Sequence, residues 1–311
     1  MNAPRSALHK ALIELHVAIL LAGITGPLGR LITLPAEALV WYRLGLSLPL
    51  FIAISLWYQK PVPRFTRKQW TLLVINGLLI GFHWVCFFSS VKYANVSVAL
   101  VCFATSSLFT ALLDPWVNGN GLRWRQVALS LLGLAGIVVL FQFNVQYRLG
   151  IALGLLAAVL SALFTLLNEK PAQQIPARTL SMYELLFAWL ILSLFAPWYI
   201  HLHGMHWPGA MDWLYLLILS WLCTVLAFTL SLSALKHISP FTINLSYNLE
   251  PVYGILIAFA LFHENRMLGI SFYAGFACIL LSVLLQTLYT LHQHRQALGK
   301  PANQKFITPT D

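Results

Sequence analysis

The hydrophobic positions of this chain gather into long stretches that short polar connectors separate. A bilayer core of about 30 Å is crossed by about 20 apolar residues in a helix. The connectors are too short for a soluble domain, so we expect an all-α polytopic membrane protein. The stretches predict ten membrane-spanning helices, at residues 11–28, 36–58, 70–91, 96–117, 124–143, 149–168, 180–200, 211–235, 239–262 and 268–290.

The composition supports a chain whose surroundings are mostly lipid. Of the 311 residues, 59% are hydrophobic and 9% are charged, whereas soluble domains carry about 25% charged residues. The formal net charge is +10, but the positive residues are dispersed between apolar segments and do not form one basic face. We therefore expect no nucleic acid as a partner. The four cysteines lie inside apolar runs without metal-ligand spacing, so we expect neither a metal nor a cofactor.

The positive charges also predict how the chain is oriented. With the N-terminus inside, the connectors on that side carry most of the 19 Lys and Arg residues. Cytoplasmic loops of membrane proteins show this excess. We therefore expect an even number of crossings in the cytoplasmic (inner) cell membrane. The N-terminus at residues 1–10 and a disordered tail at residues 291–311 would both be cytoplasmic.

Two pairs of segments indicate an internal repeat. LPAEALVWYRL at 34–44 matches IPARTLSMYEL at 175–185 in Pro, Ala, Leu, Tyr and Leu. FFSSVKYANVS at 87–97 matches TLSLSALKHISPF at 229–241, with a Lys aligned in each. The offsets of the two matches are nearly equal, as a duplication would require.

The repeat divides the chain into halves at residues 11–145 and 146–290. Each half contains five predicted spans, and an odd number puts the halves in opposite orientations. We expect two inverted five-helix repeats around a central cavity. This arrangement is typical of secondary transporters that alternate around a site near the membrane midplane.

Several polar side chains fall deep inside the predicted spans. A charge at the bilayer centre costs from about 2.5 kcal/mol upward, so such groups face the bundle interior and are functional candidates. The interface-facing segment HLHGMHW lacks carboxylate or Cys partners, so we do not assign it a metal. The candidate substrate-binding residues are Asn76, His83, Trp84, Asn244, Tyr247, Asn248 and Glu250.

Glu250 is the most unusual of these residues, because a helix breaker follows it. It lies about 11 residues into its span, close to mid-membrane, and Pro251 frees a carbonyl near Tyr247. Asn244, Tyr247, Asn248 and Pro251 share one helix face. Glu250 either accepts hydrogen bonds from a neighbouring helix and fixes the bundle, or binds substrate or a proton, or does both. We expect Pro251 to have a structural role.

Two further charged residues lie inside spans at matching positions of the repeat. Arg43 belongs to the second span and Glu184 to the seventh. We interpret both as structural polar anchors, either at a helix end or as an ion pair between the halves.

NLEPVYGILIAFALFHENRMLGISFYAGFACILLSVLL at 248–285 resembles the EamA-type transporters of the drug/metabolite transporter superfamily. WYRLGLSLPL at 41–50 and YELLFAWLILSL at 183–194 resemble the second spans of that family's two halves. The resemblance covers about residues 12–290. It implies a ten-helix bundle and a central cavity lined mainly by spans 1, 3, 4, 6, 8 and 9. It also implies the export of metabolites such as amino acids.

The first half departs from the family pattern where the second half follows it. Thr105, Ser106 and Ser107 stand where the second half has Leu-Glu-Pro, and Asn120 replaces an acidic residue of the family. A role for Glu250 is therefore not carried over to the first half.

Together these features predict a secondary active exporter of small metabolites such as amino acids or amphipathic compounds, working by alternating access and coupled to protons. The alternatives are an intramembrane enzyme, for which His83 and Glu250 form the one candidate pair, and a passive channel or non-transporting membrane partner. The chain has no Walker loop, HExxH, GxSxG or GxGxxG motif. We therefore expect no enzyme and no ATP-driven transport on this chain, and we leave its oligomeric state open.

Overall fold

The computed structural model describes residues 3–58, 64–94, 96–141, 148–250, 252–253 and 270–299. The described residues are helical and contain no strand, which confirms the expectation of an all-α protein. The helices are α1 (Ala3–Gly23), α2 (Thr25–Leu31), α3 (Ala36–Tyr58), α4 (Arg67–Tyr93), α5 (Val96–Ala104), α6 (Ser106–Asn118), α7 (Trp124–Phe141), α8 (Arg148–Gln174), α9 (Ala177–His203), α10 (Ala210–Ser220), the π-helix η1 (Trp221–Leu226), α11 (Ala227–Ala234), α12 (Pro240–Ser246), the 3₁₀-helix η2 (Tyr247–Leu249) and α14 (Ile270–Gly299).

Within the described residues, seven helical segments are long and apolar enough to cross a membrane. They correspond to the expected spans 1–4 and 6–8. Of the others, α7 covers most of the fifth span, and the last two spans extend into residues outside the described ranges, Pro251 among them. Several boundaries differ from the prediction: α1 begins at Ala3, α8 runs to Gln174 and α14 extends beyond residue 290. α14 runs to Gly299, so residues 291–299 are helical where we expected disorder, because no Gly or Pro interrupts the sequence before that point.

Three of the expected spans are broken helices, and polar groups lie at two of the breaks. Between α5 and α6, the hydroxyl of Thr105 donates a hydrogen bond of 2.5 Å to the carbonyl of Cys102. Such back-bonding competes with the helical ladder and bends helices. In η1 the Thr224 hydroxyl donates to the Leu219 carbonyl at 2.8 Å, five residues earlier. α1 and α2 are separated at Ile24.

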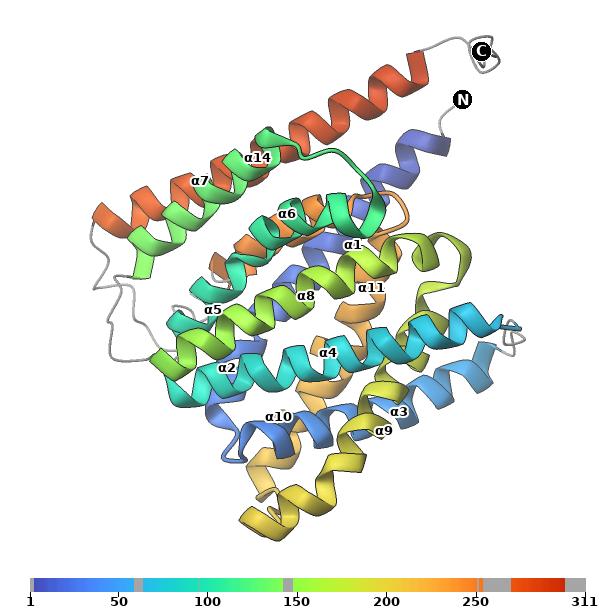
Figure 1. Cartoon of the computed structure of the whole chain (residues 1–311), viewed down its shortest axis with the longest axis vertical. Coiled ribbons are helices and arrows are strands. Elements are labelled where there is room, and N and C mark those ends of the chain that lie inside the picture. The colour runs from blue at the N-terminus through green and yellow to red at the C-terminus, as the bar shows by residue number, and fades with distance from the viewer. Residues whose placement is uncertain are drawn as a thin grey trace.

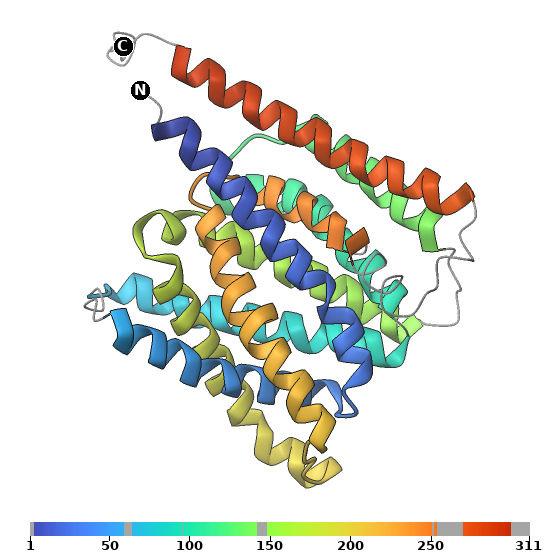
Figure 2. The ribbon, with the colours of Figure 1, turned by 180° about the vertical axis from the view of Figure 1, so that it is seen from behind.

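The helices form one bundle with a separate pair along one side. α4 and α8 lie side by side, α9 crosses α3 and α4, and α1 packs on α11 at the back (Figures 1 and 2). α7 and α14 form the side pair. The start of α1 and the end of α14 lie at the same end of the molecule (Figure 2).

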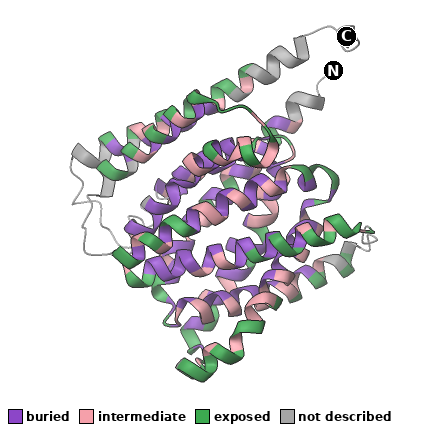
Figure 3. Cartoon of the chain, in the orientation of Figure 1, coloured by how far each residue is buried: buried purple, intermediate pink, exposed green. Residues whose placement is uncertain are grey.

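Buried residues follow the inner faces of the helices, and exposed ones follow the outer faces and ends (Figure 3). Large apolar side chains are exposed on these outer faces, such as Ile13, Leu56 and Leu194. A soluble protein does not expose so much apolar surface. The outer faces are therefore suited to lipid.

Gly77 allows α4 and α9 to approach closely. A Cβ atom at this position would lie 2.6 Å from the Cβ of Phe187 and 2.9 Å from the carbonyl oxygen of Glu184. Small residues at such crossings let helix backbones touch in membranes. The contact fixes where the α9 side chains meet α4.

Replacing Gly77 by Ala is expected to destabilise the protein. The added methyl group overlaps α9, and overpacking typically costs about 1–3 kcal/mol, more than the gain in helix propensity of roughly 1 kcal/mol. Thermal unfolding of the purified protein in detergent would show a lower Tm. Gly121→Ala is the control, because no atom lies within 4 Å of a Cβ there. Equal Tm values for the two variants would contradict the packing argument.

Candidate functional site

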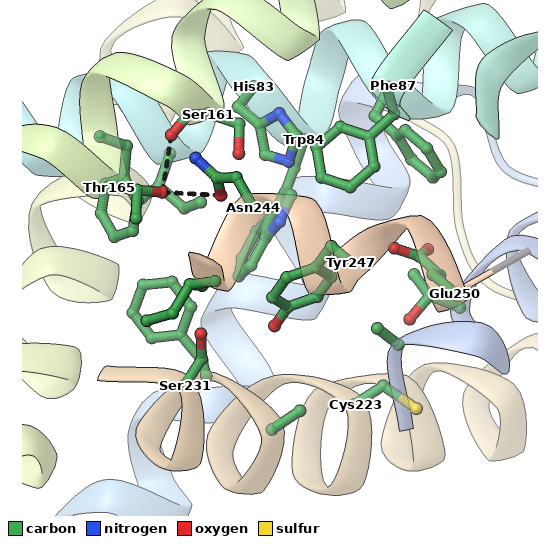
Figure 4. A pocket seen from close by; sticks show the side chains of 18 of the residues that line it. His83, Trp84, Phe87, Ser161, Thr165, Cys223, Ser231, Asn244, Tyr247 and Glu250 are labelled. Carbon is green, nitrogen blue, oxygen red and sulfur yellow. Dashed lines mark hydrogen bonds between the residues drawn. The ribbon is translucent and has the colours of Figure 1, made fainter. Parts of the chain in front are cut away.

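A cavity of about 110 Å³ lies in the centre of the bundle. Five of the seven predicted substrate-binding residues line it: His83, Trp84, Asn244, Tyr247 and Glu250. In Figure 4 the residues of α12 and η2 cross the middle of this site, with His83 and Trp84 of α4 on one side. The structure thus brings α4 and the start of the expected ninth span to one site.

Asn244 connects three helices beside the cavity. Its amide nitrogen donates to the Thr110 hydroxyl of α6 at 2.7 Å. Its oxygen accepts from the Thr165 hydroxyl of α8 at 3.2 Å (Figure 4). Both hydroxyls also donate to carbonyls one turn earlier, so the single hydrogen of Thr165 is shared between two acceptors, whereas Thr110 donates to one carbonyl and accepts from Asn244. Asn244 therefore orders this wall of the cavity and has limited capacity left for a ligand.

Arg43 also lines the cavity, although the sequence predicted only an anchor. Its Nε donates to the Thr224 hydroxyl at 2.6 Å, and one terminal nitrogen donates to the Cys223 carbonyl at 3.1 Å. Both acceptors belong to the π-helix η1, whose irregular ladder makes a carbonyl available. The guanidinium lies 3.9 Å from the ring centre of Trp84, within cation–π distance. Arg43 thus joins α3 to η1.

One nitrogen of Arg43 remains available for a ligand. The guanidinium carries five N–H donors, and its NH1 group is buried without a hydrogen-bond partner in the protein. Arg43 is 3% exposed and Glu250 is 5% exposed. Arg43 and Glu250, both among the described residues, face the same cavity without forming a direct salt bridge.

Aromatic rings form much of the remaining wall. Phe164 and Phe228 pack together at 5.5 Å between ring centres, and Phe103 lies 5.3 Å from the ring of His83. The Nδ1 atom of His83 lies 2.8 Å from the Ala157 carbonyl, which can only accept. In the neutral ring, Nδ1 therefore carries the proton and Nε2 is the acceptor. The site combines a guanidinium group and a carboxyl group with an apolar, aromatic surface.

Two predicted cavity residues lie elsewhere. The amide nitrogen of Asn76 donates to Glu184 Oε1 at 2.8 Å, which also replaces the expected ion pair between Arg43 and Glu184. Asn248 points toward α7, where its amide nitrogen would be 2.6 Å from a Cβ placed on Gly133. A sequence indicates helix faces but not how neighbouring helices are rotated. Pro251 lies outside the described residues.

The sequence did not single out the hydroxyl groups that line the cavity. These residues scatter through apolar spans, where Ser and Thr commonly bond their own backbone and give no distinct pattern. Their alignment with the polar face of α12 becomes visible only once the helices are packed. They are Thr25, Ser161, Thr165 and Ser231.

Known proteins share both the sequence pattern and the fold. The model of the EamA-like transporter family matches residues 9–142 and 148–288. An uncharacterized transporter of Synechocystis sp. is 24% identical over 285 residues, which cover 86% of this chain and 80% of the relative. The uncharacterized transporter YetK of Bacillus subtilis is 21% identical over 280 residues, or 87% of this chain and 84% of that protein.

A solved crystal structure has the same fold. It superposes with a TM-score of 0.72 over 91% of this chain and 98% of its own length, at 22% sequence identity. At this level of identity the likeness shows the fold alone. The relatives' names point to transport rather than to an enzymatic reaction.

Replacing Arg43 by Lys is expected to destabilise the protein although the charge is kept. A lysine ammonium group lacks the planar, forked donors of Arg43. It cannot hydrogen-bond the Thr224 hydroxyl and the Cys223 carbonyl while also stacking on the Trp84 ring. Hydrogen bonds of charged groups contribute about 1.5–3 kcal/mol each, so we expect a clearly lower Tm in detergent. Arg30→Lys is the matched control, because Arg30 is exposed. An Arg43→Lys variant as stable as this control would contradict the anchoring role.

Proposed function

The chain belongs to the EamA-like transporter family, and from that premise we propose that this multi-pass membrane transporter is a secondary carrier exporting small zwitterions. Amino acids with an apolar side chain are the substrate class that fits the cavity best. The observation that carries the proposal is the pair of buried, opposite charges, Arg43 and Glu250, on one aromatic-walled cavity. Proton coupling, alternating access and the direction of transport are parts of the same proposal.

The charges of a zwitterion complement those of the cavity. Its carboxylate accepts a hydrogen bond from the unpaired NH1 group of Arg43, and its ammonium group lies against Glu250. Charged groups leave water only where opposite charges and hydrogen bonds receive them. An apolar side chain then packs against Phe164 and Phe228.

The packing supports two inverted repeats with bounds near 11–145 and 146–290. Arg43 of α3 bonds to η1, and Glu184 of α9 bonds to Asn76 of α4. In each contact, the second predicted span of one half presents a charged residue to the third span of the other half. Two repeats related by an inverted axis would produce such paired contacts. The family model, which matches once in each half, supports the same division.

We propose ten crossings, both termini in the cytoplasm and a location in the cytoplasmic membrane. The excess of positive residues on one set of connectors supports this orientation. In this arrangement the cavity opens alternately to either side as the halves move against each other. The proton coupling requires a carboxyl group that changes its protonation during the cycle, and Glu250 and Glu184 are both buried.

Leucine counterflow in proteoliposomes tests the carrier. Trans-stimulation by internal leucine is expected from a carrier, and its absence in the wild type would contradict the proposal in favour of a channel or a non-transporting protein. Conversion of leucine into a product would instead favour an enzyme built on His83 and Glu250.

Substrate analogues test the charge pairing. Isocaproate lacks the ammonium group of leucine, and isoamylamine lacks its carboxylate. Each is expected to compete about 10–100-fold more weakly than leucine, the factor that corresponds to one charged hydrogen bond of about 1.5–3 kcal/mol. Glu250→Gln should remove the preference for leucine over isocaproate and leave the preference over isoamylamine. If Glu250→Gln leaves both preferences unchanged, Glu250 does not hold the ammonium group.

A further inference from the structure

A second polar cluster lies outside the cavity, where α4, α8 and α9 meet. It consists of Asn76, Asn168 and Glu184, and all three side chains are 0% exposed. Asn76 donates to Glu184 Oε1 at 2.8 Å. Asn168 lies beside the same carboxyl group, but neither atom of its amide makes a well-aligned hydrogen bond. Glu184 Oε2 and Asn76 Oδ1 are also buried without a partner.

The groups that face Glu184 are neutral. α4 presents Asn76 and α8 presents Asn168, and among the described residues no charged side chain is a partner of this carboxyl group. Of the other helices packed on α9, α3 carries Arg43, which is bound to η1, and α11 contains no charged residue. A carboxylate buried among amides alone is costly to ionise. The closed arrangement therefore favours the neutral acid.

The neutral acid fits its two neighbours. Oε1 accepts from Asn76, and when the Asn168 amide is turned with its oxygen toward Oε2, a proton on Oε2 lets the carboxyl group donate to that oxygen. The ionised form has no donor of its own and leaves that oxygen unpaired. We propose that Glu184 is the proton-binding residue that couples transport to the proton gradient. This inference rests on the carrier function proposed above.

The cluster and the cavity share two helices. On α4, Asn76 and His83 are seven residues apart, about 10 Å along the helix and on the same face. On α8, Asn168 follows Thr165 by three residues, and Thr165 bonds Asn244 in the cavity wall. A movement of α4 or α8 that changes the cavity therefore also changes the surroundings of Glu184.

The contact at Gly77 closes the cluster. There α4 and α9 touch beside Glu184, so separating the two helices exposes Oε2 to water. In the exposed state the O–H bond breaks, the proton passes to water and a carboxylate remains. Reclosure requires a proton from water again. Closure therefore takes up a proton from the side that the open state faces, and opening on the other side releases it there.

Glu184→Gln tests the proposal because glutamine imitates the protonated acid. Its Oε1 accepts from Asn76, and its amide nitrogen donates to Asn168, but it releases no proton. In proteoliposomes, leucine counterflow should continue within about twofold of wild type, since exchange needs no net proton movement. Substrate-driven change of the internal pH, and accumulation driven by a pH gradient, should be lost. Proton flux at the wild-type level in this variant would overturn the proposal.

Glu169→Gln is the matched control, because Glu169 neighbours Asn168 on α8 and bonds Asn118 at 2.9 Å. It should keep both counterflow and proton flux, and loss of proton flux alone in this control would overturn the assignment to Glu184. Wild-type counterflow that moves no protons, or accumulation that follows a sodium gradient instead, would overturn the inference and leave the carrier standing. Absence of wild-type counterflow would remove the carrier function itself.

An infrared measurement keeps the assignment testable if Glu184→Gln does not fold. Difference spectra of the purified wild type between acidic and alkaline buffer should show the C=O band of a protonated carboxyl group. Asn76→Ala keeps Glu184 and removes the hydrogen bond to Oε1, so that band should shift to higher wavenumber. The proposal would be overturned if the wild type showed no titrating carboxyl band. It would also be overturned if the band had the same wavenumber in Asn76→Ala as in the wild type.

Discussion

The structure depends on one constraint: a polar group inside the bundle must find its partner within the protein, because lipid offers none. The contact of Arg43 with the π-helix η1 shows how strong this constraint is. The helix departs from regular geometry where the guanidinium needs a carbonyl, and the guanidinium bonds both that carbonyl and the neighbouring hydroxyl of Thr224. This contact also places a positive charge on the central cavity, so a requirement of folding creates the binding chemistry.

The same constraint gives the two repeat-related charged residues different surroundings. Arg43 cannot lose its charge and is met by a carbonyl, a hydroxyl and an aromatic ring. Glu184 can become neutral by taking up a proton, so two amides suffice. In the proposed duplicated architecture, one half thus carries a permanent charge and the other a titratable group.

Much of this architecture could be predicted from the sequence, because lipid imposes one length and one polarity on every span. The helical class and the interior positions of His83 and Glu250 followed from that pattern, and the family followed from the resemblance of residues 248–285. The positions of Asn76 and Asn248 outside the cavity could not be predicted, since packing sets how one helix is rotated against another. The π-helix could not be predicted either, because its residues have the pattern of an ordinary apolar span. Only the contact with Arg43 gives a reason for the irregularity.

The charge balance of the cavity favours a proton site outside the cavity. Arg43 and Glu250 sum to zero, and a zwitterion adds no net charge, so the loaded and the empty cavity are electrically alike. A carrier built on these groups alone would change orientation with or without substrate and gain no direction from a gradient. A titrating residue in contact with the same moving helices supplies the missing difference. In the proposed cycle Glu184 closes favourably only when protonated, so a difference in pH across the membrane makes closure from the two sides unequal.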